Sequence, residues 1–230
     1  MKKKVFPSEL AYLCGIVILA LGVIFMEKAD FGMSMVVAPA YLVYLKVSET
    51  FPFFTFGMAE YAFQGLLLLL MIPVLRRFRL SYLFSFATAV FYGFVLDGEE
   101  LLLRSLPAEG IPLRLCWYVV GLLLCSLGVS LLFHTYISPE VYELFVKEGS
   151  DRFGVNINRF KTGYDCVSCL VGVILSFAFF GLWHFEGVKL GTILCALVNG
   201  TVIGVFSKLL ESLFTFEDKL PFREFFLGKK

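Results

Sequence analysis

The sequence predicts an all-α fold: a polytopic membrane helix bundle with six spans and two shorter segments. Of the 230 residues, 59% are hydrophobic and 17% are charged, whereas soluble domains average about 45–50% apolar and about 25% charged residues. The apolar residues are also gathered into long uncharged runs, which helices in contact with lipid require. Composition and patterning together therefore argue against a soluble globular enzyme.

Five uncharged runs are long enough to cross a bilayer, because about 20 helical residues cover the roughly 30 Å of hydrocarbon. These runs are 10–26, 80–96, 115–133, 166–185 and 190–207. A sixth span is predicted at 53–75, where Glu60 is the only charged residue and a basic cluster follows. The first run could imitate a signal peptide, but it is long and no Ala-X-Ala site follows, so we interpret it as a span.

Two segments between these runs are too short or too charged to cross lipid easily. The segment 31–45 contains Pro39, and the segment 136–149 contains one proline, three glutamates and one lysine. A charge at the centre of a spanning helix costs about 2.5–3.5 kcal/mol, so 136–149 is a poor span. We therefore prefer six spans to eight. The sequence leaves open whether the short segments are re-entrant half-helices or interfacial amphipathic helices.

The order of elements predicts two related halves, 8–106 and 111–214, within one transmembrane domain that covers 1–230 and ends in a cytoplasmic tail, 215–230. Each half has a span, a short proline-containing segment, a span with an early acid, and a last span. With three spans in each half, the second half is inverted relative to the first, so we expect an inverted 3+3 repeat. Small residues match between the halves: Gly15 with Gly121, Gly22 with Gly128, and Gly93 with Gly204.

The basic residues predict how the chain is oriented. Six spans with both termini in the cytoplasm place 15 of the 20 Lys and Arg residues inside, as the positive-inside rule requires, and eight spans give the same count. The net charge of +1 gives no indication of nucleic-acid binding. The lipid bilayer is thus the predicted partner, and a homo-oligomer or a protein partner stays open.

Several motifs carry a resemblance to a known family. In the first half it rests on Phe31-Gly32-Met33-Ser34 followed by Pro39, which is similar to a Leu-Gly-X-Ser-Pro region. In the second half it rests on Val141-Tyr142-Glu-Leu-Phe-Val146, on Arg159-Phe-Lys161 before Asp165, on Gly191-Thr192 and on Ala196-Leu-Val-Asn199-Gly200. On these residues the chain, from about Leu10 to Phe214, resembles the YczE/YyaS/YitT-like family. The resemblance implies a multi-span protein of the bacterial cytoplasmic membrane, in a family that is largely uncharacterised. Met35 follows Ser34 here, so a role tied to an immediate Ser-Pro does not carry over.

Two intramembrane acids, Glu60 and Asp165, are the leading candidates for a substrate site. Ionisable residues are costly within a membrane and usually face a cavity or a partner. The two acids lie 105 residues apart in matching positions of the halves, which would place them near the axis of an inverted repeat. The alternative is structural, because a carboxylate is favoured at a helix N-terminus and Lys161 lies four residues before Asp165.

Four further residues complete the predicted substrate-binding set: Gln64, Asn199, Ser34 and Tyr164. Gln64 lies one turn after Glu60 on the same helix face. Asn199 lies among small residues halfway along the last run, where it either binds substrate or hydrogen-bonds between helices. Ser34 belongs to the motif of the resemblance, and Tyr164 directly precedes the second acid.

The motifs of common enzymes are missing from the sequence. There is no His-Glu-X-X-His metal motif, no phosphate-binding loop, no Gly-X-Ser-X-Gly elbow and no dinucleotide fingerprint. We therefore expect no cofactor, no metal and no enzymatic activity. The leading hypothesis is a secondary transporter or permease for a small polar solute or ion. The alternative is a membrane-embedded solute-binding or accessory subunit that works with a protein partner.

Overall fold

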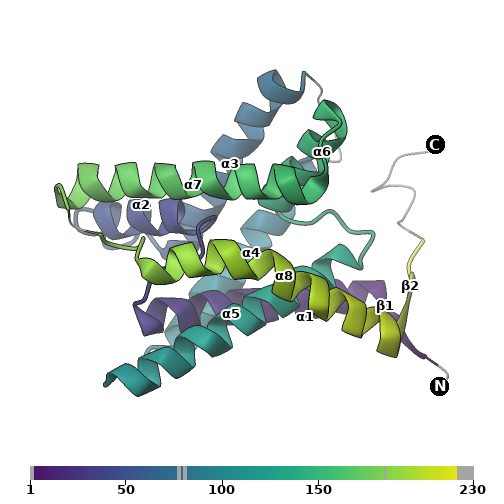
Figure 1. Cartoon of the computed structure of the whole chain (residues 1–230), viewed down its shortest axis with the longest axis horizontal. Coiled ribbons are helices and arrows are strands. Elements are labelled where there is room, and N and C mark those ends of the chain that lie inside the picture. Colours follow the sequence, from purple (N-terminus) through teal and green to yellow (C-terminus); the bar gives the residue numbers. More distant parts are fainter. Residues whose placement is uncertain (1–2, 77–78, 80–81, 184, 222–230) are drawn as a thin grey trace.

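The structure is a computed structural model that describes residues 3–76, 79, 82–183 and 185–221. Within these residues it contains eight α-helices and two short β-strands (Figure 1). The helices are α1 (Ser8–Ala29), α2 (Ala38–Ser48), α3 (Phe56–Leu75), α4 (Tyr82–Leu103), α5 (Ile111–Phe133), α6 (Val141–Phe153), α7 (Ile157–Phe180) and α8 (Leu190–Leu213). The strands are β1 (Lys4–Pro7) and β2 (Phe214–Glu217).

Five of the described helices, α1, α3, α5, α7 and α8, are long and apolar enough to cross a membrane. The chain is thus a helical, multi-pass membrane protein. The sixth long helix, α4, has 22 residues, but its last two turns carry Asp97, Glu99 and Glu100. These acids lower the hydropathy of this end of α4, which is not among the five candidate spans.

The two short segments form the short helices α2 and α6, with 11 and 13 residues. At 1.5 Å per residue they rise about 17 and 20 Å, less than the roughly 30 Å of hydrocarbon. Both lie further along the chain than predicted. The first segment begins with an irregular stretch, and α2 starts only at Ala38, with Pro39 in its first turn. Proline suits this position, since it has no N–H to leave unpaired.

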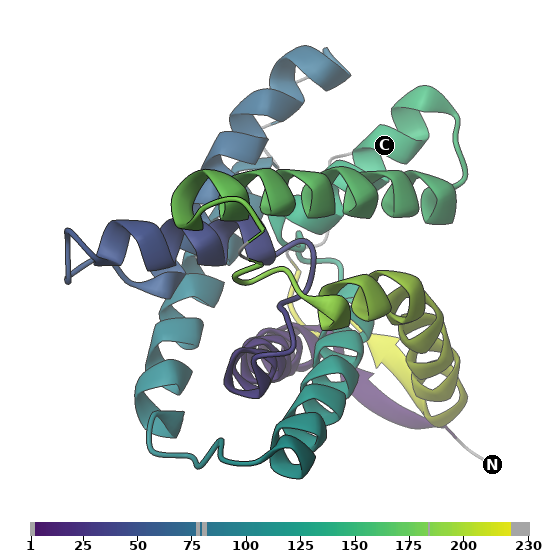
Figure 2. The same ribbon diagram turned by 60° about the vertical axis from the view of Figure 1, so that its left-hand side comes forward.

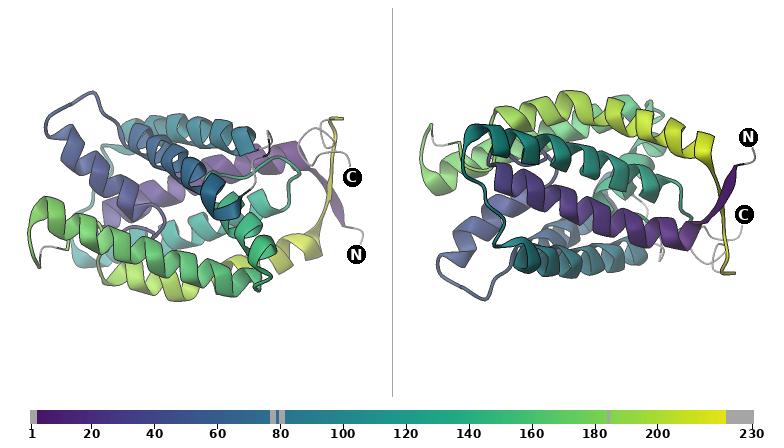
Figure 3. Two further views of the ribbon diagram at one scale, coloured as in Figure 1. Left: turned by 90° about the horizontal axis from the view of Figure 1, so that it is seen from above. Right: turned by 90° about the horizontal axis from the view of Figure 1, so that it is seen from below.

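The centre of the bundle is the contact between α1 and α5, which run antiparallel and lie side by side (Figure 3). Glycines allow the two backbones to touch. A Cβ atom added at Gly22 would lie 2.8 Å from the carbonyl oxygen of Gly121, and one added at Gly128 would lie 2.8 Å from that of Gly15. Any larger residue would force the helices apart.

The remaining helices surround this pair. Helix α4 packs on α1 and α8 packs on α5, while α2 contacts α7 and α6 contacts α3. Figure 2 shows α7 and α2 along one side of the molecule, with α1, α5 and α8 along the other. Helices α3 and α4 are in close contact, because a Cβ atom at Gly57 would lie only 2.1 Å from the carbonyl oxygen of Gly93.

A short parallel β-ladder joins the two ends of the described chain, a feature that the sequence did not predict. Strand β1 pairs with β2 so that Lys4 lies opposite Phe214 and Pro7 opposite Glu217. The carboxylate of Glu9 accepts hydrogen bonds from the backbone N–H groups of Lys219 and Leu220. The tail predicted at 215–230 therefore begins as a strand attached to α1. Its residues 222–230 lie outside the described part of the chain.

Candidate substrate site between the helices

A buried polar cluster links α3 to the start of α6. Glu60 and Gln64 lie one turn apart on α3, and neither is accessible to solvent. The Gln64 side-chain N–H group donates to Glu140 at 2.7 Å and lies 3.5 Å from Glu60. The Gln64 oxygen accepts from the backbone N–H of Val141 at 3.0 Å, and the Tyr142 hydroxyl donates to Glu60 at 3.1 Å. One amide thus holds two carboxylates close together.

Three carboxylate oxygens in this region are buried and have no hydrogen-bond partner among the described residues. They are Oε1 of Glu60, Oε1 of Glu140 and Oε2 of Glu143. A buried acceptor without a partner normally costs about 1–3 kcal/mol, and more when it is charged. Such groups mark a place where a proton or a ligand supplies the missing partner.

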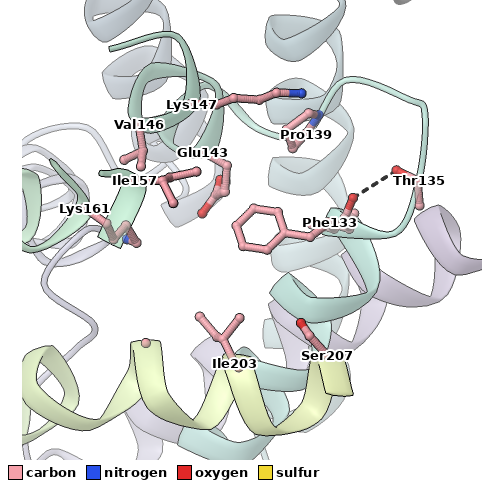
Figure 4. A pocket seen from close by; sticks show the side chains of 13 residues that line it. Phe133, Thr135, Pro139, Glu143, Val146, Lys147, Ile157, Lys161, Ile203 and Ser207 are labelled. Atoms are coloured by element: carbon pink, nitrogen blue, oxygen red, sulfur yellow. Dashed lines mark hydrogen bonds between the residues drawn. The ribbon is translucent and has the colours of Figure 1, made fainter. Parts of the chain in front are cut away.

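Two adjoining cavities lie next to these acids. The smaller, of about 40 Å³, lies at the centre of the bundle and is lined by residues of α1, α4, α5, α6, α7 and α8 and of the stretch before α2. The larger, of about 430 Å³, lies between α6, α7, α8 and the end of α5. Glu143, Lys161 and Ile203 line both cavities. Figure 4 shows Glu143 and Lys161 on one side of the larger cavity, with Ile203 on the other.

Asp165 lies apart from the cluster around Glu60 and is paired with Lys161. The Lys161 ammonium group donates to the Asp165 carboxylate at 2.7 Å. Within one turn of helix this is the ion pair that the spacing predicted. Tyr164 packs its ring against Phe145, with 5.5 Å between the ring centroids. The ion pair of the structural interpretation is therefore present, but Asp165 lies two turns after the start of α7 and not at its N-terminus. Its partner Lys161 lines the cavities.

Ser34 and Asn199 both line the small cavity. Ser34 comes from the irregular stretch before α2, and its hydroxyl lies 3.9 Å from the sulfur of Met35. The side-chain oxygen of Asn199 accepts a hydrogen bond from the Ser126 hydroxyl at 2.8 Å. Asn199 thus forms the hydrogen bond between helices that one interpretation predicted, and it also lines the small cavity.

The structure brings together most of the predicted set and adds residues that the sequence analysis missed. Glu60 and Gln64 join in one cluster, and Ser34 and Asn199 lie at the small cavity. The missed residues are Tyr92, Glu140, Tyr142, Glu143 and Lys161. A signal for two of them was present, because the acids in 136–149 had already made that segment a poor span.

Glu140, which precedes α6, and Glu143, in its first turn, belong to none of the five helices long and apolar enough to span, and both are strongly perturbed. Burial raises the pKa of the Glu140 carboxyl well above its usual range, and the nearby Glu143 and Glu60 raise it further. Burial also raises the pKa of Glu143, an effect that nearby Lys161 opposes. A buried carboxyl group with a raised pKa retains its proton when water is excluded, and exchanges it when a cation approaches.

The acidic end of α4 has in part a structural role. Asp97 accepts a hydrogen bond from the Thr55 hydroxyl at 2.7 Å and another from the backbone N–H of Gly57 at 2.7 Å. Thr55 in turn caps α3 by accepting from the backbone N–H of Met58. Asp97 therefore holds the start of α3, a position at which a carboxylate also stabilises the helix dipole. In the described residues, no group of three or more His, Cys, Asp or Glu side chains could hold a metal ion.

The comparisons with known proteins identify the family. Residues 6–208 match the model of a family of unknown function, DUF6198. The chain belongs to this family. The match covers both halves, from β1 to the last turns of α8. No curated protein and no solved structure matches the chain.

Proposed function

We propose that this DUF6198 protein is a secondary transporter or permease for a small polar solute or ion, with its site between the two halves of the bundle. The observation that carries the proposal is the group of buried carboxylates with unpaired oxygens at the cavities between α6, α7 and α8. Ionisable groups at such places commonly bind substrate or protons in transporters. The chain itself then performs no covalent chemistry.

An inverted repeat is part of the proposal. Gly15 and Gly22 match Gly121 and Gly128, each 106 residues later. In the structure Gly15 packs on Gly128 and Gly22 packs on Gly121, which is the reciprocal contact that a twofold axis between antiparallel helices generates. The short helices follow the same symmetry: α2 of the first half packs on α7 of the second, and α6 of the second half packs on α3 of the first. Inverted repeats of this kind place substrate sites at the interface of the halves.

The proposed six spans leave α2 and α6 as short helices that do not cross the membrane. The positions of charged residues support this. Arg79, before α4, lies 3.3 Å from Glu148 of α6, so the two lie at the same end of the bundle. At the other end Asp30 contacts both Arg114 and Lys189. We propose that the Arg79 end, together with both termini, faces the cytoplasm of a bacterial cell, as the basic residues predict.

The two halves differ in how tightly they close, as transport by alternating access requires. In the first half Gly93 packs directly on Gly57. Its match in the second half, Gly204, has no atom within 4 Å of an added Cβ and lines the larger cavity. We infer a second state in which α8 closes on its neighbours at Gly204 and the first half opens.

Solute uptake into proteoliposomes tests the proposal. The purified chain is reconstituted, a pH gradient is imposed, and labelled amines, amino acids, sugars and inorganic ions are supplied in turn. We expect uptake of one class, driven by the gradient, and its loss in Glu140→Gln. Binding of a solute without its movement would instead support the membrane-embedded binding subunit that hands solute to a protein partner. If no solute either moves or binds, both functions are wrong.

A further inference from the structure

The small cavity is lined by more acidic than basic side chains. Two acids, Glu140 and Glu143, line it, and Lys161 is the one basic side chain among its described lining residues. The Lys161 ammonium group is already held by Asp165 at 2.7 Å. Neither acid of the cavity therefore has a cation to itself, although both are shielded from water. A bound cation would remove this imbalance, since a buried charge is stable only when it is paired.

The unpaired acceptors of the cavity favour a donor with several N–H groups. Oε1 of Glu140 and Oε2 of Glu143 have no partner among the described residues. Ser34 and Tyr142 also line this cavity. An alkylammonium group has three N–H donors and no acceptor, as in lysine. With a volume of about 40 Å³, the cavity has room for such a group, since a water molecule needs about 10–15 Å³ on this scale.

The larger cavity next to it is mostly apolar. Leu132, Phe133, Val146 and Ile157 line it together with Ile203. Lys147 also lines this cavity, but its side chain is exposed to solvent, where its charge is screened. The volume of about 430 Å³ falls in the range of pockets that hold small organic ligands, about 300–1,000 Å³. Because Glu143 borders both cavities, a ligand there can place its charge in one and an apolar body in the other.

We propose that the two cavities together bind a small primary amine, with its ammonium group at Glu140 and Glu143 and its apolar part in the larger cavity. The inference rests on the proposed function and names the substrate class of that site. An inorganic cation would leave the apolar cavity without a role. A carboxylic acid would bring a second negative charge against Glu143.

Matched probes test the class of ligand on the purified full-length chain. Thermal unfolding and titration calorimetry are carried out with n-butylammonium, 1-butanol, butyrate and sodium at equal ionic strength. We expect n-butylammonium alone to bind and to raise the melting temperature, since a ligand of the folded state shifts the folding equilibrium. Shortening the chain to methylammonium should weaken binding about fourfold per methylene removed.

Two variants locate the binding site. Glu143→Gln keeps the shape of the side chain but removes the charge, so n-butylammonium should bind at least about tenfold more weakly, the loss expected for a hydrogen bond to a charged group. Glu99→Gln is the matched control, because Glu99 also has a buried, unpaired oxygen but does not line either cavity. It should bind like the natural chain.

The outcomes separate this inference from the proposed function. Equal binding of sodium, 1-butanol or butyrate would overturn the proposed amine class. Uptake of neutral or anionic solutes into proteoliposomes, without any binding of amines, would overturn it as well. That second result would support the transporter function but show that the substrate class is wrong. Amine binding that Glu143→Gln leaves unchanged would overturn the site. If Glu143→Gln does not fold, the probe series on the natural chain still decides the ligand class.

Discussion

At the scale of single residues, Gln64 is the side chain on which the buried acids depend. It satisfies Glu140 through its amide N–H group and the start of α6 through its oxygen. Without it, a carboxylate and a backbone N–H would both lose their partners inside the bundle. The cost of an unpaired buried group exceeds the net gain from the bond itself. Removing Gln64 alone should therefore destabilise the fold more than removing Gln64 and Glu140 together.

Gln64→Leu should lower the free energy of unfolding by about 3 kcal/mol, because Glu140 and the Val141 N–H are left unpaired. The double variant Gln64→Leu with Glu140→Met should recover part of this loss, since it removes the carboxylate as well as the amide. Chemical unfolding in detergent measures both. If the double variant lost more free energy of unfolding than the two single variants lose in total, this account of the cluster would be contradicted.

The raised pKa of Glu140 predicts how stability depends on pH. The folded state holds a proton at this carboxyl that the unfolded chain releases near its ordinary pKa of 4.5. Between that value and the raised pKa the folded state binds more protons, so the free energy of unfolding falls as pH rises. We expect a lower melting temperature at pH 8 than at pH 6, and a smaller difference in Glu140→Gln. If the melting temperature of Glu140→Gln changed with pH as much as that of the natural chain, the pH dependence would come from another group.

At the scale of helices, the α1–α5 contact depends on glycine. Alanine at Gly22 would place its Cβ 2.6 Å from the backbone nitrogen of Cys125, so Gly22→Ala should destabilise the fold by about 1–3 kcal/mol through overpacking. Gly200→Ala is the control, because that position has open space and alanine favours the helix. It should be neutral or stabilising. Thermal unfolding of the two variants compares them, and equal losses would show that the effect does not come from the close α1–α5 contact.

Gly204→Leu tests the second closed state. The position is open in this structure, so the variant should fold normally, although the leucine also occupies part of the larger cavity. It should transport at least about tenfold more slowly, because a large side chain blocks close approach of the helices. Gly98→Leu, also at an open position, should transport normally. Normal transport by Gly204→Leu would show that α8 does not close at this point.

The helices themselves could be predicted from sequence, whereas several contacts between them could not. Long apolar runs mark a span by length and composition alone, and Gln64 could be placed on the face of Glu60 from helical spacing. Its hydrogen bond to Glu140 joins residues 76 positions apart, and no local pattern indicates it. The β1–β2 ladder could not be predicted for the same reason, since it pairs Lys4 with Phe214 at opposite ends of the chain. Each strand also has only four residues, near the short end of the usual range.

At the scale of the whole molecule, the number of spans decides which loops face the same side. Six spans place Glu49, after α2, and Glu109, before α5, outside the cell, whereas eight spans place both inside. Asp151 of α6 faces the cytoplasm in either arrangement. All three side chains are exposed in the structure, so each can carry a reactive cysteine.

Single cysteines at these positions decide between the two arrangements. The exposed Cys116 and Cys166 are first replaced, because they would also react. In intact cells a membrane-impermeant maleimide should label Glu49→Cys and Glu109→Cys, and it should label Asp151→Cys only after the cells are opened. The short helices rise only about 17 and 20 Å, so neither should carry the chain across the bilayer. Protection of Glu49→Cys and Glu109→Cys in intact cells would mean that α2 crosses. With an even number of spans in each half, the two halves would then have the same orientation, and the inverted repeat would be wrong.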